Sequence, residues 1–255
     1  MPLLYFTSFM MASHMDTSDH IPVDMFAAQQ ALLVERLQIL LVSLDPELRN
    51  DVVLALKAPG KLLSNDSSET EIASLQASAL SAGAWPLLTL LIAQHLAPEL
   101  AVPVAADVAI AVECFVCAID LLDDAVDGDQ TPLIASIGVP RMLNVSTALL
   151  MLAQRAILSL SSQGVASERI LSLLDALQDG VLTVTEGQHR DLLAERLPVE
   201  EFDQEICLEI AAAKAGALMR LVCLLGALCA GADAQLCALC AKLGELLGIA
   251  HQLDN

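Results

Sequence analysis

Basic and aromatic residues are both scarce in this chain. Lys and Arg together number 12, against 32 Asp and Glu, so the formal net charge at pH 7 is −20. Nucleic acids and anionic membranes are bound through basic surfaces, and this charge balance therefore argues against both as partners. An anionic ligand would have to be bound by metal ions or by a very few cationic side chains.

The low aromatic content also bears on the fold. Aromatic residues make up 3% of the 255 residues, whereas Leu and Ala dominate a hydrophobic fraction of 56%. Strands are enriched in aromatic and β-branched residues, so this composition favours helices, and it is sufficient for a large core. We expect a single all-α domain over residues 26–255. Residues 1–25 would form an extension that is disordered or derived from cloning.

Two apolar stretches raise the question of a membrane. Residues 1–15 contain no Lys or Arg, so the cationic start of a secretory signal peptide is missing. Residues 72–98 carry no charged side chain except for one His, but Ser, Gln, Gly83 and Pro86 interrupt them. These interruptions argue against a stable membrane span, and we expect a cytoplasmic protein.

The cysteines are also consistent with the expected cytoplasmic location. Seven is an odd number, and all seven lie within apolar helical patterns, which is typical of reduced, buried thiols. The pairs Cys114-x-x-Cys117 and Cys237-x-x-Cys240 could instead be zinc half-sites, but they are distant in sequence and no His accompanies either closely. Core packing is the favoured interpretation.

Helical spacing of apolar residues and capping signals divide the chain into helices. Asp45-Pro46 predicts a cap followed by a first helical residue, and Gly128 would end the long helix that Pro103 starts. An irregular segment with two prolines, residues 132–140, is expected next. The predicted helices cover residues 26–44, 46–57, a stretch from about 69, 103–127, 141–161, 167–193, 200–230 and 233–255.

A cluster of carboxylates ends the predicted helix 103–127. Asp123 and Asp127 are four residues apart and share a face, and Asp120 points the same way one turn earlier. Like charges at the C-terminal end of a helix dipole are unfavourable, so a cation should compensate. Mg2+ is typically held by one or two carboxylates plus substrate phosphates, which makes a Mg2+–diphosphate site our hypothesis. A solvated acidic helix end is the alternative.

Three further motifs follow the Asp cluster in a fixed order. They are Glu186-Gly187-Gln188-His189-Arg190-Asp191-Leu192, Lys214-Ala215-Gly216-Ala217-Leu218, and Leu247-Gly248-Ile249-Ala250-His251-Gln252-Leu253-Asp254-Asn255. This order resembles the trans-polyprenyl diphosphate synthases of the class I isoprenoid synthase superfamily, where DDxxD, GQxxDL, a Lys-Thr segment and GxAFQxxDDxxD follow one another. The resemblance covers roughly residues 80–255. It implies an isoprenoid-synthase-type helical bundle with a central cavity.

The resemblance also implies metal ligands. Asp123 and Asp127 match the Mg2+-coordinating aspartates of the first motif, with Asp124 beside them. Asn255 falls at the first acidic position of the second motif, and three Mg2+ ions with bound diphosphate would be expected. Because the matched motif continues beyond Asn255 in the family, we expect the chain to be truncated there.

Substrate contacts are implied in the same way. Gln188 and Asp191 match the polar pair in the wall of the diphosphate pocket, and Lys214 matches the lysine that contacts the allylic diphosphate. Gln252 matches the Gln of the second acidic motif. Asp123, Asp127 and Lys214 would be the catalytic residues. Asp120 is either a fourth ligand or, in our preferred interpretation, an acceptor behind the ligands.

Some basic residues of the family pattern are missing. Chain-elongating members carry a GKRxRP segment, a His before DDxxD and an Arg pair after it, which bind isopentenyl diphosphate and the allylic substrate. We match these to residues 81–86, Val116 and Pro132-Leu133, none of which is cationic. A second diphosphate could not be desolvated there without counter-ions. The isopentenyl diphosphate site is therefore expected to be absent.

Three functions are open at this point. The favoured one is Mg2+-dependent ionisation of an allylic prenyl diphosphate, with the carbocation passed to another acceptor, as in terpene cyclases or in prenyl transfer to a peptide. Few aromatics could stabilise a cation, with only Trp85 and Phe115 near the motif, which weakens the cyclase version. The alternatives are an ordinary chain-elongating synthase and a non-catalytic partner subunit. We expect a homodimer, or a heteromer with another synthase.

Overall fold

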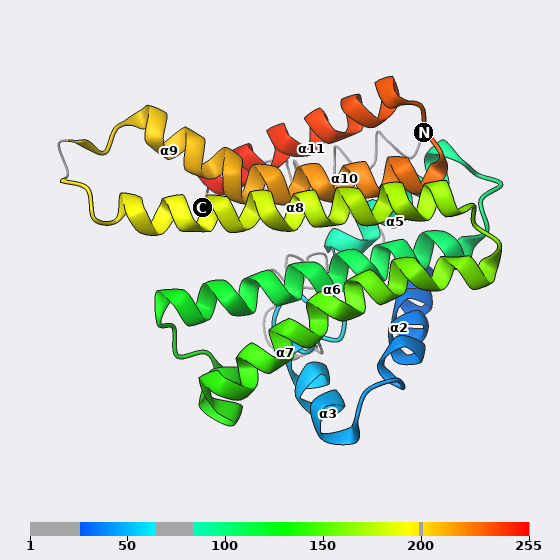
Figure 1. The fold of residues 1–255 in the computed structure, drawn as a ribbon, viewed down its shortest axis with the longest axis horizontal. Helices are drawn as coiled ribbons and strands as arrows, with labels where there is room; N and C mark the ends of the chain where they lie inside the picture. Colours follow the sequence, from blue (N-terminus) through cyan, green and yellow to red (C-terminus); the bar gives the residue numbers. More distant parts are fainter. Residues whose placement is uncertain (1–25, 65–83, 199–200, 255) are drawn as a thin grey trace, which may run out of the picture.

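Nine α-helices and two short non-α turns make up the described part of the chain. The computed structural model describes residues 26–64, 84–198 and 201–254, and it contains no strand within these ranges. The long helices run side by side in a bundle (Figure 1). The elements are α2 (Ala27–Leu41), α3 (Pro46–Ala55), α5 (Ala84–Leu96), α6 (Val102–Asp127), α7 (Pro132–Ser159), η2 (Leu160–Gln163), α8 (Ser167–Ala194), α9 (Gln204–Ala211), η4 (Ala212–Gly216), α10 (Ala217–Ala230) and α11 (Ala234–Asp254).

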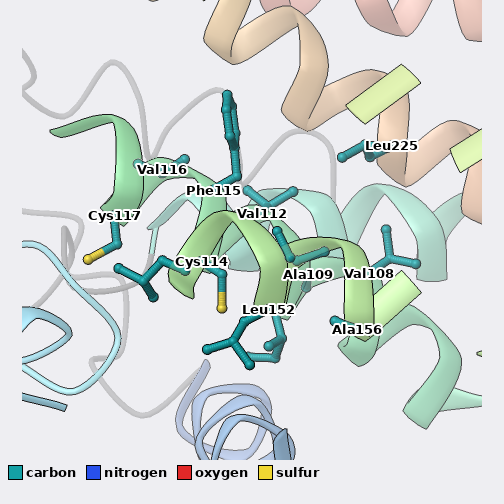
Figure 2. Close-up of a cluster of buried hydrophobic side chains, with 14 of the residues drawn as sticks. Val108, Ala109, Val112, Cys114, Phe115, Val116, Cys117, Leu152, Ala156 and Leu225 are labelled. Carbon is teal, nitrogen blue, oxygen red and sulfur yellow. The ribbon is translucent and has the colours of Figure 1, made fainter. Parts of the chain in front are cut away.

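Helix α6 is the centre of the bundle. It packs against α7, α5, α2 and α10, and every residue from Val104 to Cys117 is buried. A helix that is apolar on all sides belongs inside a protein. Figure 2 shows Val112 and Phe115 of α6 within a cluster of buried side chains that includes Leu225 of α10. This packing fixes the position of the Asp cluster at the end of α6.

The predicted helix ends around α6 are confirmed. Gly128 has φ 76° and caps α6 in the left-handed conformation, and its N–H bonds to Asp124 O. Asp45 caps α3 through a bond from Glu47 N, with Pro46 in the first turn. Figure 1 shows the C-terminal ends of α6 and α8 at the same end of the bundle. The motifs on these two helices are therefore brought to one place.

The prediction of an irregular segment over residues 132–140 was wrong except at Gly138, because most of the segment is helical. Pro132 lies in the first turn of α7, where a missing N–H costs nothing, and Thr131 Oγ1 accepts a bond from Ile134 N at 3.4 Å. Helical structure resumes after Gly138, whose φ of 75° and ψ of 156° make a kink. Pro140 begins the second part of α7, so its missing N–H likewise breaks no helical hydrogen bond.

The remaining helix predictions have mixed outcomes. The helix expected over residues 200–230 begins only at Gln204 and is interrupted by η4, a π-helical turn. The helix expected from about residue 69 lies outside the described residues, as do the extension 1–25 and Asn255. Capping of α9 by Asp203, which accepts from Ile206 N at 3.0 Å, explains the later start.

Four stretches of the described residues are long and apolar enough to cross a membrane. They are Val102–Asp127, Pro132–Gln163, Gln204–Ala230 and Ala234–Asp254, and 83%, 33%, 61% and 22% of their most apolar windows is buried in the bundle. For α6, burial in the core accounts for the apolar composition. The absence of a stable membrane span stays a prediction.

Candidate functional site

The Asp cluster is partly enclosed at the end of α6. Asp123 and Asp124 are half-buried, whereas Asp127 is exposed. Burial raises the pKa of Asp123; Lys214 opposes this shift, and the negative charges of Asp127 and Asp120 add to it. Burial likewise raises the pKa of Asp124, and Asp120 adds to the shift. A divalent cation would relieve this repulsion.

Lys214 lies between two carboxylates from different helices. Its Nζ is 2.6 Å from Asp191 Oδ2 of α8 and 3.6 Å from Asp123 Oδ1 of α6. Burial lowers the pKa of Lys214, but the hydrogen bond to Asp191 and the charge of Asp123 raise it more, so the net shift is upward. The ammonium therefore stays charged and links η4 to both helices.

Gln188 brings α8 to the same cluster. Its Nε2 lies 3.5 Å from Asp127 Oδ1, while its Oε1 is buried and has no hydrogen-bond partner. Buried polar atoms are normally satisfied, so an unpaired acceptor beside carboxylates suggests a missing donor or ion. Gln188 and Asp191 are three residues apart and lie on one face of α8, as their spacing predicts.

Two glycines let the π-helical turn of Lys214 lie close to its neighbours. A Cβ on Gly187 of α8 would be 2.5 Å from Ala213 O, and one on Gly248 of α11 would be 2.1 Å from Ala215 O. Both obstacles are backbone atoms, which cannot rotate away. π-Helical turns often occur at functional sites, and here the turn carries the lysine.

The structure adds a cation that sequence reasoning did not include. Lys61, 7% exposed, follows α3 and forms an ion pair with Asp120, so a protein cation does reach this region. The next residue, Leu62, donates its N–H to Glu113 Oε1 at 2.6 Å. The Gly60-Lys61 pair is the sequence feature that could have indicated this cation. The GKRxRP segment of the family pattern was matched to residues 81–86, of which 81–83 lie outside the described residues.

Some of the predicted site residues lie together, and others do not. The structure brings together five of the predicted site residues, namely Asp123, Asp127, Gln188, Asp191 and Lys214. Gln252 is exposed near the end of α11 and makes no hydrogen bond to them. Val116 and Leu133 are buried and apolar, so they supply no cation. Asp120 accepts a hydrogen bond from Lys61 Nζ, and its place behind the metal ligands stays a prediction.

The Asp cluster fits a metal ion that is coordinated by protein carboxylates and by a substrate together. No group of three or more His, Cys, Asp or Glu side chains in the described part of the chain is arranged to hold an ion by itself. Mg2+ is commonly bound by one or two carboxylates, waters and substrate phosphates, so Asp123 and Asp127 suffice as the protein's share. The unpaired Gln188 Oε1 could accept from a metal-bound water.

The fold has relatives among solved structures. The structure of a geranylgeranyl pyrophosphate synthase aligns with a TM-score of 0.73 at 23% identity, covering 89% of this chain and 62% of that one. A decaprenyl diphosphate synthase from Rhodobacter capsulatus gives 0.69 at 20% identity, covering 91% and 64%. Geranylgeranyl pyrophosphate synthetase from Pyrococcus horikoshii Ot3 gives 0.70 at 19% identity, covering 91% and 64%. The bundle is thus the all-α isoprenoid synthase fold.

The family follows from the sequence comparison. The family model described as Polyprenyl synthetase matches residues 81–255, which is well over half of the chain, and the chain belongs to this family. The chain spans less than two thirds of the length of these three solved structures. A comparison with curated proteins gave no match.

Proposed function

We propose that the chain acts as a Mg2+-dependent enzyme that ionises one allylic prenyl diphosphate and passes the carbocation to an acceptor other than isopentenyl diphosphate. The observation that carries this proposal is the convergence of Lys214, Gln188 and Asp191 on Asp123 and Asp127. Such a set of one cation, a polar wall and paired carboxylates suits a metal-bound diphosphate.

Asp123 and Asp127 would hold Mg2+, with Asp124 beside them and Asn255 on the second motif as a further candidate ligand. Up to three ions with the bound diphosphate are expected. Bound Mg2+ would supply Lewis-acid stabilisation of the charge that develops on the leaving diphosphate.

The chain's own residues would bind and orient the diphosphate. Lys214, which stays protonated, would donate to a terminal phosphate oxygen after exchanging one of its carboxylate partners. Gln188 would orient a water or phosphate oxygen through its amide. The α6 residues before the Asp cluster, including Phe115 and Val116, are buried and apolar, and apolar surroundings of this kind would shield a reactive cation from water.

A chain-elongating synthase is the second candidate. The observation that favours it is Lys61, a cation that pairs with Asp120 at the Asp cluster and not with Asp191. The argument against it is that Asp120 already neutralises this lysine. Transfer to a non-isoprenoid acceptor and cyclisation of the substrate itself remain two versions of the first candidate, and the cyclase version has few aromatic side chains to support it.

Product analysis separates these candidates. The purified protein would be incubated with Mg2+ and geranyl, farnesyl or geranylgeranyl diphosphate, with and without isopentenyl diphosphate. Diphosphate release that needs no isopentenyl diphosphate, and that Asp123→Asn abolishes, is the expected result. Asp175→Asn, which removes an exposed carboxylate of α8 remote from the cluster, is the matched control and should leave release unchanged.

Other outcomes would overturn the proposal. Longer prenyl diphosphates formed only with isopentenyl diphosphate would favour the elongating synthase. No release with any substrate, together with altered product length when a partner synthase is added, would indicate a non-catalytic subunit. Analytical ultracentrifugation of the same preparation tests the expected homodimer, and cell fractionation tests the expected cytoplasmic location.

A further inference from the structure

Lys61 and Asp120 form an ion pair at the side of the Asp cluster. The Lys61 side chain is 9% exposed, whereas that of Asp120 is 50% exposed, so the lysine is held inside and the carboxylate covers its charged end. The two residues are 59 positions apart, so tertiary packing and not local chain geometry brings them together. The carboxylate therefore lies where an incoming anion would have to bind.

The charge of a second carboxylate, that of Glu113, also acts on Lys61. Glu113 is completely buried, accepts from Leu62 N through Oε1 and has no partner at Oε2. Lys61 is thus paired with Asp120 and also influenced by the charge of Glu113, and the three side chains carry a net charge of −1 when all are ionised. Such a group repels an anion, although it contains a lysine.

A second lysine, Lys214, also contacts acidic side chains at this end of α6. All twelve Lys and Arg residues of the sequence fall in the described ranges. Of these, Lys214 is the other one that contacts the Asp cluster, and it is paired with Asp191 and Asp123. Lys214 is therefore already shared between two carboxylates before any diphosphate binds.

We propose that Asp120 is a specificity-determining residue, which neutralises Lys61 and so prevents a second, metal-free diphosphate from binding beside Asp123. This inference deepens the proposed function and rests on it, since it explains why the acceptor would not be a diphosphate. Replacing Asp120 by Asn keeps the shape and a hydrogen-bond acceptor but removes the charge, and the three side chains then carry no net charge. Lys61 becomes available to a phosphate oxygen.

Binding without metal tests the proposal. Isothermal titration calorimetry in EDTA and low salt would measure inorganic diphosphate and isopentenyl diphosphate separately against the wild type and Asp120→Asn. We expect at least tenfold tighter binding of both by Asp120→Asn than by the wild type. The gain should disappear in the double variant Lys61→Gln/Asp120→Asn. Thermal unfolding of each variant verifies that the bundle is intact.

A matched control separates a local effect from general charge. Asp129→Asn removes one exposed carboxylate just beyond the same helix but makes no contact with Lys61, so it should change binding less than threefold. Equal gains in Asp129→Asn and Asp120→Asn would overturn the proposal, as would a gain that persists without Lys61 or no gain at all. The assay contains neither Mg2+ nor an allylic substrate, so failure of the proposed turnover is measured independently of it.

Discussion

Lys214 Nζ lies 2.6 Å from Asp191 Oδ2, so the cation expected to contact a diphosphate is already paired with a carboxylate of the neighbouring helix. The 3.6 Å separation from Asp123 leaves the ammonium between α8 and α6. A diphosphate bound as proposed would therefore compete with Asp191 for the lysine. This arrangement holds Lys214 in place between the two helices.

Removal of the Lys214 charge should lower turnover more than it lowers stability. For Lys214→Gln we expect kcat for diphosphate release to fall by about 10²-fold or more, because a charge-stabilising donor acts mainly in the transition state. Lys214→Arg keeps the charge and should retain more activity than Lys214→Gln. Steady-state kinetics with Mg2+ and an allylic diphosphate measure both, and equal activity of Lys214→Gln and wild type would refute the assigned role.

Added side chains at the two close-approach glycines should destabilise the bundle. Gly187→Ala and Gly248→Ala place a Cβ against the backbone oxygens of Ala213 and Ala215, at 2.5 and 2.1 Å before relaxation. We expect each to lower the free energy of unfolding by about 1–3 kcal/mol. Gly180→Ala is the control, because its Cβ would meet only the flexible end of Leu221. Urea unfolding should rank Gly180→Ala as the mildest of the three.

Local signals made much of the fold predictable from sequence. The ends of α3 and α6 follow from Asp45-Pro46 and Gly128, whose conformational preferences act without long-range contacts. The irregular segment around Pro132 failed because proline is also favoured in the first turn of a helix, so the same residue can start α7. The π turn at Lys214 had no sequence signal of its own, since it depends on how α8 and α11 pack against it.

The candidate site, like the fold, was predictable only where local spacing determines it. Spacing alone places Asp123 with Asp127 and Gln188 with Asp191, because residues three or four apart share a helix face. The resemblance implies that Lys214 contacts a diphosphate, but neither the resemblance nor the spacing predicts its pairs with Asp191 and Asp123. Lys61 was missed because it pairs with Asp120 only through tertiary packing, at a separation of 59 residues.

Thiol reactivity should report on the bundle interior. Burial raises the pKa of Cys117, Cys223 and Cys229 to about 12, and that of Cys114 well above its usual value. Neutral, buried thiols react slowly, so a disulfide reagent at pH 8 should modify the half-buried Cys207 and Cys240 first. Mass spectrometry of a time course measures the order. Rapid labelling of Cys223 in the folded protein would contradict the packing.

The same shifts predict alkaline destabilisation. Unfolded thiols lose their protons near pH 9 while the folded ones hold theirs to about pH 12, so the unfolded state is favoured as pH rises through this window. The melting temperature should fall from pH 8 to pH 10.5. The double variant Cys223→Ala/Cys229→Ala should show a smaller fall over the same interval, and an identical fall would exclude these thiols as its cause.

A buried ion pair at the opposite end of α6 should contribute far more to stability than an exposed one. Asp107, 5% exposed, accepts from Arg36 Nε and Nη2 at 2.7 and 2.6 Å and from Gln163 Nε2 at 2.6 Å, so it ties α2 and η2 to α6. Asp107→Ala leaves a half-buried guanidinium and an amide without their acceptor. We expect the free energy of unfolding to fall by about 3–5 kcal/mol.

The comparison is with Asp51→Ala, which removes a bidentate pair whose partner Arg141 is 57% exposed. Solvent screens such a pair, so the expected loss is less than about 1 kcal/mol. Urea denaturation followed by circular dichroism measures both. Equal losses of unfolding free energy in Asp107→Ala and Asp51→Ala would show that burial does not increase the contribution of Asp107 to stability. The double variant Arg36→Met/Asp107→Leu should recover most of the loss, because removing both charges together leaves neither one buried and unpaired.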